Sequence, residues 1–256
     1  MKSNNLQVIY VMWLREMKRF IRSSSRVAGT IAMPFFFLLA MGFGFGPSFM
    51  LANGGGGVNY INFLVPGIIA MTMLFNSMFS GLSVLWDKEF GFLKEILVAP
   101  VKRPVIILGR IAGGITTALI QAFLILLISL LFGFKVVNPV GILLAVVFMI
   151  LIGVGFTGFG VALASVMDDV QGFPLITQLI TFPLFLLSGA LFPVNNFPAW
   201  LKPFTLMNPL AYGVDGLRGA LIGYSQIPFS LAFSVCLIFA LAMVGLGAWL
   251  FNKTEA

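Results

Sequence analysis

The chain has 256 residues, of which 60% are hydrophobic and 9% are charged, and its formal net charge is +7. Soluble domains carry roughly a quarter charged residues, so this composition excludes an ordinary soluble protein and predicts an all-α membrane protein. The chain has no His and one Cys, which excludes His-based acid–base catalysis, His-ligated metal sites and a disulfide framework, and no metal site is expected. The basic residues lie at the edges of apolar segments, which indicates membrane topology and no nucleic-acid partner.

Residues 1–26 predict a cytoplasmic amphipathic helix and not a signal peptide, because basic and apolar residues alternate. At about 100° per residue, one face carries Arg15, Lys18, Arg19, Arg22 and Arg26. The opposite face carries Leu6, Ile9, Tyr10, Trp13, Met17, Phe20 and Ile21. We expect this helix to lie in the membrane surface with its cations toward anionic lipid headgroups, and a basic flank of the first span is a compatible alternative.

Six apolar segments follow, each near or above the roughly 20 residues that cross a bilayer. They lie at about 27–46, 61–86, 104–132, 140–166, 173–192 and 229–251. With the N-terminus inside, twelve Lys and Arg residues fall on the cytoplasmic side and three on the outer side, which places both termini in the cytoplasm. Residues 27–256 are therefore expected to form one six-helix transmembrane domain.

The connection between the second and third spans is unusually charged, with seven charged residues between Asp87 and Arg103. A plain connector needs only a few polar residues. Its helix-like core, EFGFLKEILVAP, mixes apolar residues with charges of both signs and ends at Pro100. This pattern fits a helix that docks into a groove of another protein, and equally a helix that lies on the headgroups.

Two segments carry a family resemblance, DKEFGFLKEILVAPVKRP at 87–104 and LMNPLAYGVDGLRGAL at 206–221. They resemble the segments after the second span and before the last span in permease subunits of the ABC-2 transporter family. The likeness is to the branch of daunorubicin-resistance permeases and of nodulation and polysaccharide exporters. The six-span layout, the amphipathic N-terminal helix and the long loop before the last span are also similar, so the resemblance covers nearly the whole chain.

The resemblance implies a cytoplasmic coupling helix within about 87–103 that sits in a cleft of a separate ATP-binding subunit. Its residues are Glu89, Phe90, Gly91, Phe92, Leu93, Lys94, Glu95 and Ile96. It also implies that the N-terminal helix, with Arg15, Lys18, Arg19 and Arg22, is an interface helix lying against that ATPase. Residues 193–228 would form a re-entrant pair of short helices in the outer leaflet, with Asn208, Pro209, Asp215 and Arg218.

The implied function is transport and not catalysis. The chain resembles the permease subunit of an ATP-driven exporter that moves an amphipathic drug, lipid or lipid-linked glycan across the inner (cytoplasmic) membrane. Two copies of the chain would form a homodimer below which two ATPase subunits dock. The sequence contains no G-x-x-x-x-G-K-[ST] motif, so this chain is expected to bind no cofactor, with ATP and Mg²⁺ held by the partner.

Two alternatives from other classes remain, and each lacks its sequence signature. An integral-membrane lipid-modifying enzyme would need clustered acids or His at the membrane face, where the chain offers only two short acidic runs. A channel or secondary carrier would need ionisable residues in the middle of its spans, whereas the charges lie at the span ends.

The remaining charged residues have simpler expected roles. Asp168 and Asp169, in a tight cytoplasmic turn, are expected to be solvated and not to hold Mg²⁺. Asp215 and Arg218, three positions apart, are expected to pair on one helix face. Arg110 is expected either to extend to the inner headgroups or to bind an anionic substrate.

Small and polar residues within the spans have two expected uses. The GVGFTG motif at 153–158 lies inside a span, so it predicts close helix packing and not a dinucleotide site, as do Gly109 and Gly113. The polar side chains are expected to hydrogen-bond between helices or to line a pathway. These are Asn76, Ser77, Ser80, Thr116, Thr117, Gln121, Thr177, Gln178 and Thr181.

Overall fold

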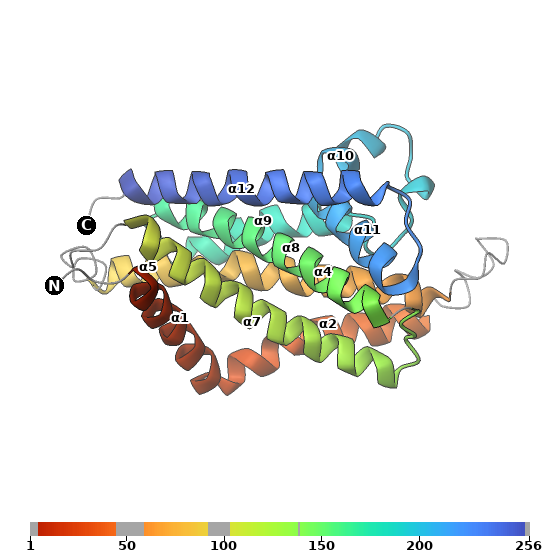
Figure 1. Ribbon diagram of the computed structural model, residues 1–256, viewed down its shortest axis with the longest axis horizontal. Helices are drawn as coiled ribbons and strands as arrows, with labels where there is room; N and C mark the ends of the chain where they lie inside the picture. Colours follow the sequence, from red (N-terminus) through yellow and green to blue (C-terminus); the bar gives the residue numbers. More distant parts are fainter. Residues whose placement is uncertain (1–4, 45–58, 92–102, 138, 254–256) are drawn as a thin grey trace.

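The computed structural model describes residues 5–44, 59–91, 103–137 and 139–253, and these residues form helices and no strand (Figure 1). The predicted all-α membrane fold is therefore confirmed. In chain order the elements are α1 (Asn5–Arg22), α2 (Ser24–Gly44), α4 (Tyr60–Ser80), α5 (Leu82–Glu89), α7 (Arg103–Leu131), α8 (Pro139–Val166), α9 (Gly172–Leu186), the 3₁₀ turn η1 (Val194–Asn196), α10 (Lys202–Met207), α11 (Pro209–Ile222) and α12 (Phe229–Lys253).

Five stretches in this part of the chain are long and apolar enough to cross a membrane, where the sequence predicts six. They are Val27–Gly44, Tyr60–Glu89, Pro104–Leu131, Val140–Val166 and Phe229–Lys253. The predicted span at 173–192 is helical only over the 15 residues of α9. At 1.5 Å per residue α9 is about 22 Å long, which is shorter than the roughly 30 Å hydrocarbon core. The structure thus has one shorter apolar helix where a full span was predicted.

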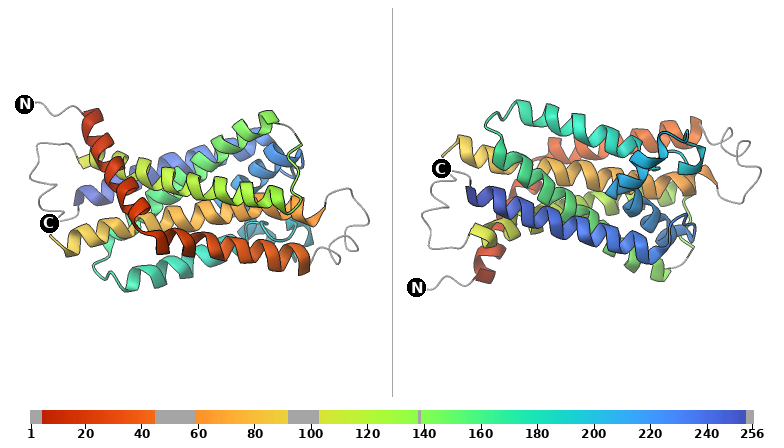
Figure 2. Two further views of the ribbon diagram at one scale, coloured as in Figure 1. Left: turned by 90° about the horizontal axis from the view of Figure 1, so that it is seen from below. Right: turned by 90° about the horizontal axis from the view of Figure 1, so that it is seen from above.

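The connections between helices lie in two groups, one at each end of the bundle (Figure 1). The start of α1, the ends of α5 and α12 and the turn between α8 and α9 lie at one end, whereas α10 and α11 lie at the other (Figure 2). This is the grouping that the predicted topology requires, because the first set was assigned to one side of the membrane and the second set to the other. That the first end faces the cytoplasm stays a prediction.

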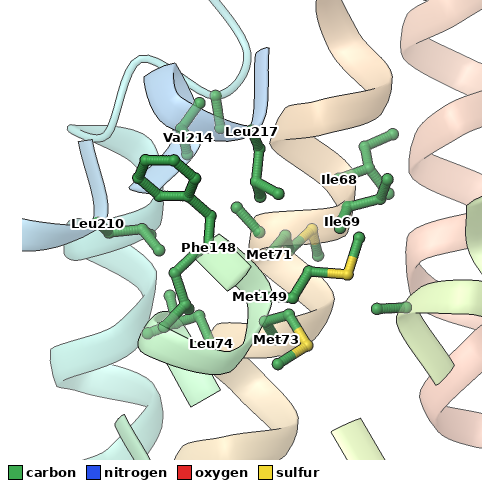
Figure 3. Close-up of a cluster of buried hydrophobic side chains, with 14 of the residues drawn as sticks. Ile68, Ile69, Met71, Met73, Leu74, Phe148, Met149, Leu210, Val214 and Leu217 are labelled. Atoms are coloured by element: carbon green, nitrogen blue, oxygen red, sulfur yellow. The ribbon is translucent and has the colours of Figure 1, made fainter. Parts of the chain in front are cut away.

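The core is built where α4, α8 and α11 meet. Buried side chains of these helices pack together, with Phe148 of α8 beside Leu210 and Val214 of α11 and Met149 of α8 beside Met71 and Met73 of α4 (Figure 3). α4 is buried on nearly all sides, which is the position of a central helix in a bundle.

Close helix packing at glycines confirms the prediction for the small residues of α8. A Cβ atom at Gly158 would lie 2.8 Å from the carbonyl carbon of Met243 in α12, and one at Gly160 would lie 2.4 Å from the carbonyl oxygen of Met78 in α4. Both glycines therefore allow backbones to approach closer than any side chain permits.

α1 packs across α7 at the two glycines that the sequence analysis singled out there. A Cβ at Gly109 would lie 2.6 Å from the Cβ of Met12, and one at Gly113 would lie 2.6 Å from the Cβ of Glu16. Trp13 Nε1 also donates a 3.0 Å hydrogen bond to Thr116 Oγ1. The face of α1 that carries Met12 and Glu16 therefore contacts the bundle.

Candidate functional site

The candidate site begins with a buried acid at the end of α5. Asp87 is 3% exposed, although in the sequence it opens the charged connection. The helix continues through Glu89, three residues past the predicted end of the span, so Asp87 lies within a helix and not in a loop. Gly81, at the junction of α4 and α5, lets this stretch approach α8 closely, because a Cβ there would lie 2.3 Å from the Gly160 oxygen.

Three arginines from two other helices surround Asp87. Arg15 of α1 donates to both carboxylate oxygens, with 3.1 Å from Nη1 to Oδ2. Arg110 of α7 donates from Nη2 to Oδ2, and Arg19 of α1 places Nη2 3.8 Å from Oδ1. We call Asp87, Arg15, Arg19, Arg110 and the neighbouring Glu16 the Asp87 cluster.

Much of the cluster is shielded from water, which strengthens the attraction between its opposite charges. The side chains of Arg110 and Asp87 are 2% and 4% exposed, and a buried charge needs a partner to be tolerated. The Glu16 carboxylate lies 3.6 Å from Arg19, and the Arg19 guanidinium lies 5.6 Å from the Trp86 ring centre. Three positive charges thus face two negative ones, and the cluster ties α1, α5 and α7 together.

These contacts correct two expectations. Arg15 and Arg19 were predicted to point to the headgroups, but they turn toward Asp87, whereas Lys18 and Arg22 are exposed. Arg110 was predicted to reach the headgroups or an anionic substrate, but its partner is Asp87. Sequence reasoning missed Asp87 as the common partner. The available signal was an acid directly after one apolar span and an arginine just inside the next.

The predicted coupling residues are only partly described. Glu89 ends α5 and is exposed, so it belongs to this helix and not to a separate one. Phe90 is 79% exposed, and Gly91 follows with a φ of 72°, which favours glycine and ends the helix. Phe92, Leu93, Lys94, Glu95 and Ile96 lie outside the described residues. The role of the whole segment in coupling stays a prediction.

A second ion pair at the same end of the bundle is exposed. Lys88 of α5 pairs with Asp168, which follows α8 and whose side chain is 86% exposed. Asp169 Oδ1 accepts a 2.8 Å hydrogen bond from the Gln171 N–H and so shapes the turn into α9. Both acids are exposed, as the sequence predicts for a solvated turn.

At the opposite end, residues 193–228 contain two short helices, α10 and α11, as the family resemblance implied. Asn208 begins α11, because its Oδ1 accepts from the Leu210 N–H at 3.0 Å and Pro209 occupies the first helical turn. The Asn208 side chain also donates a 2.6 Å hydrogen bond to the Leu184 oxygen, which fastens α11 to α9. That the pair dips into the outer leaflet stays a prediction.

The predicted pairing of Asp215 with Arg218 is wrong. The Asp215 carboxylate accepts hydrogen bonds from the connection to α12, namely from Ser225 Oγ and the Gln226 and Ile227 N–H groups. Arg218 donates instead to backbone oxygens of Phe63, Gly189 and Ala190. Helical spacing allowed the pair, but each side chain found partners on other segments.

An apolar groove of about 320 Å³ runs between α2 and the α4–α5 stretch. Its lining includes Met33 of α2, Phe75 and Asn76 of α4 and Trp86 of α5. A smaller polar cavity, lined by Glu16, Arg19 and Gln121 among others, shares Asn76 with the groove. An apolar site with a few polar groups at one end suits an amphipathic molecule.

Most of the predicted polar groups in the spans bond within their own helix. Examples are Asn76 to the Thr72 oxygen and Thr181 to the Thr177 oxygen, each at 2.9 Å. The Trp13–Thr116 hydrogen bond joins two helices, as predicted for this class. A transport pathway lined by these groups stays a prediction.

Known proteins match this chain over most of its length. Residues 7–222 match the family described as ABC-2 type transporter. YadH of Escherichia coli K12, named an inner membrane transport permease, is 29% identical over 239 residues, which cover 90% of this chain and 89% of YadH.

Two further relatives match over part of their length. A transport permease by name, ycf38 of Cyanophora paradoxa, is 32% identical over 161 residues, which cover 62% of this chain and 56% of ycf38. YbhR of Escherichia coli K12, named a probable multidrug ABC transporter permease, is 30% identical over 159 residues, or 62% of this chain and 43% of YbhR. The chain therefore spans about half the length of these two relatives.

Proposed function

Because this chain belongs to the ABC-2 type transporter family, we propose that it is the permease subunit of an ATP-driven exporter in the inner membrane. The proposal is supported by the names of YadH and YbhR, which describe transport permeases. The chain has no phosphate-binding G-x-x-x-x-G-K-[ST] motif, so ATP and Mg²⁺ belong to a separate ATPase subunit. Two copies of the chain form the transport unit, and two ATPase subunits dock to it.

The Asp87 cluster is the observation that carries the mechanism. α5 leads directly into the charged segment 87–103, and Asp87 fastens its end to α1 and α7. A displacement that an ATPase imposes on this segment, or on α1, therefore moves three helices together and not one alone. Nucleotide binding then biases the bundle between two conformations, which is what coupling requires.

The cargo that fits best is amphipathic, as a drug, a lipid or a lipid-linked glycan is. The groove between α2 and the α4–α5 stretch supports this class, because apolar side chains line most of it and Asn76 links it to a polar cavity. Trp86 lines the groove and contacts Arg19, a member of the Asp87 cluster, so cargo in the groove would lie next to this cluster. Cargo and ATPase would thus act on neighbouring side chains.

Co-purification tests the central claim. The full chain is crosslinked in its native membranes through residues 87–103, extracted in mild detergent and analysed by mass spectrometry. We expect a stoichiometric partner that carries the G-x-x-x-x-G-K-[ST] motif and hydrolyses ATP. If no nucleotide-binding protein is recovered, the ATP-driven proposal is wrong.

A paired substitution tests the coupling residues. Glu89→Ala combined with Phe92→Ala should leave the chain folded and bound in the membrane but remove cargo-dependent ATP hydrolysis. The matched control is Asp168→Ala at the same end of the bundle, where the side chain is 86% exposed. Wild-type transport by the double variant would show that this segment does not couple.

A further inference from the structure

A polar cavity of about 140 Å³ lies at the end of the bundle that holds α10 and α11. Asn195, Thr205, Asp215 and Arg218 are among the residues that line it. It is separate from the Asp87 cluster and from the apolar groove, which share none of these residues. Its two charged side chains are buried, with Asp215 5% and Arg218 2% exposed.

The hydrogen bonds of Arg218 go to backbone oxygens, and Asp215 attracts its charge from beyond ion-pair distance. Nε donates to the Phe63 oxygen at 3.3 Å, and Nη2 donates to the oxygens of Gly189 at 3.1 Å and Ala190 at 3.5 Å. The guanidinium carbon lies 3.6 Å from the Phe63 ring centre. Among the described residues no carboxylate lies within ion-pair distance of Arg218. A cation held in this way remains favourable for an anion that can enter the cavity.

Asp215 is already occupied and does not serve as this anion. Its oxygens accept from Ser225 Oγ at 2.7 Å, from the Gln226 N–H at 3.0 Å and from the Ile227 N–H at 2.8 Å. These bonds hold the connection between α11 and α12 against α11. They also direct the oxygens of Asp215 toward these donors.

Thr205 supplies an independent sign of a missing partner. It is 1% exposed, and its Oγ1 makes no hydrogen bond to the described residues. Buried polar groups without a partner are uncommon and cost free energy, so such a group beside a cavity indicates a bound polar molecule. Asn195, exposed at the rim, adds an amide donor.

We propose that this cavity binds one phosphate group, contacted by Arg218, Thr205 and Asn195. A phosphate presents oxygens in several directions and can therefore satisfy donors from three separate segments, whereas a carboxylate presents two oxygens in one plane. The cavity lies at an end of the bundle, where lipid headgroups meet a spanning protein. The phosphate can belong to a phospholipid headgroup or be free in solution, and both sources have the same chemistry.

Ligand-dependent thermal stability of the full chain in detergent tests the proposal. The probes are inorganic phosphate, a short-chain phosphatidylglycerol and, as a planar anion, acetate. We expect at least one phosphate probe to raise Tm and acetate to have no effect at the same concentration. If only phosphatidylglycerol raises Tm, the site binds a lipid headgroup. If only inorganic phosphate raises Tm, the site binds a soluble anion. If both probes raise Tm, the site accepts a phosphate from either source.

Substitutions locate the site. Thr205→Val should weaken phosphate affinity about tenfold, as loss of one hydrogen bond to a charged ligand does, and should leave the ligand-free Tm unchanged because Oγ1 has no partner to lose. Thr181→Val is the matched control, since this buried threonine bonds within α9 and does not line the cavity. Arg218→Lys keeps the positive charge but loses the planar guanidinium with its several N–H donors, so it should also weaken phosphate binding.

Three results would overturn the proposal. These are the absence of any stabilisation by both phosphate probes, an equal effect of acetate, and wild-type affinity in both Thr205→Val and Arg218→Lys. The readout is binding and does not require an ATPase or transport. A failure here therefore leaves the proposed transport function untouched, and a failure of that function leaves this site untouched.

Discussion

Asp87 of α5 and Arg110 of α7 form an ion pair inside the helix bundle, with side chains that are 4% and 2% exposed. Arg15 of α1 completes the arrangement with two hydrogen bonds to the same carboxylate. One acid thus joins three helices at the point where the charged segment 87–103 begins. Removing it would leave a buried arginine without its partner.

Asp87→Asn should lower the free energy of unfolding by about 3–5 kcal/mol, because a buried charge that loses its partner is strongly destabilising. The measurement is SDS-induced unfolding of the purified chain in mixed micelles. Asp168→Asn is the control, since the Lys88–Asp168 pair is exposed and should contribute under about 1 kcal/mol. Equal losses in the two variants would contradict a structural role for burial at Asp87.

Replacing both members of the buried pair should lower the free energy of unfolding less than replacing one of them. Asp87→Leu with Arg110→Leu removes both charges that are shielded from water, and Arg15, whose side chain is 27% exposed, retains access to solvent. A double-mutant cycle on the same unfolding measurement gives the interaction free energy between Asp87 and Arg110. Strictly additive losses in the two single variants and the double variant would show that Asp87 and Arg110 do not interact.

Gly158→Ala should destabilise the chain by about 1–3 kcal/mol, because the new methyl group would lie 2.8 Å from the carbonyl carbon of Met243 and force α8 away from α12. Gly245→Ala on α12 is the control, since a Cβ there meets nothing within 4 Å. Thermal unfolding in detergent compares the two. If Gly245→Ala lowered the stability as much as Gly158→Ala, the effect would come from helix propensity and not from packing.

Filling the apolar groove should block transport without unfolding the chain. Met33→Trp places a larger side chain in a groove of about 320 Å³, and we expect at least a severalfold loss of efflux of an amphipathic fluorescent dye from cells. Phe36→Trp is the control, because Phe36 is 64% exposed on the same helix and does not line the groove. Unchanged efflux in Met33→Trp, with normal amounts in the membrane, would exclude the groove as the cargo site.

Sequence patterns predicted the class of fold and several local features. The composition and long apolar runs require helices, because lipid offers no partners to an unpaired backbone. The two short helices near the C-terminal end followed from the family resemblance, and Asn208 and Pro209 begin α11 through a local cap. The glycines of α8 also predicted close packing correctly, because a small residue in a span has few other uses.

The partners of the charged residues could not be predicted in this way. Spacing placed Arg15 and Arg19 on one side of α1, and it allowed Asp215 to pair with Arg218. It could not show that Asp87, 72 positions away from Arg15, would accept from it, or that Asp215 would bind the connection to α12. Such contacts depend on which segments meet.

The sequence by itself determined which stretches are helical and which residues share a face, because these properties follow from local backbone and side-chain chemistry. The tertiary structure alone decided which face turns inward. Lipid and protein interior are both apolar, so hydrophobicity does not distinguish a lipid-facing side from a packed one. In α12, Ile238 and Leu241 are 66% and 65% exposed while the smaller Ala240 is buried, since only close backbone approach selects the contact face. The buried pairing of Asp87 with Arg110 is a consequence of that same choice of faces.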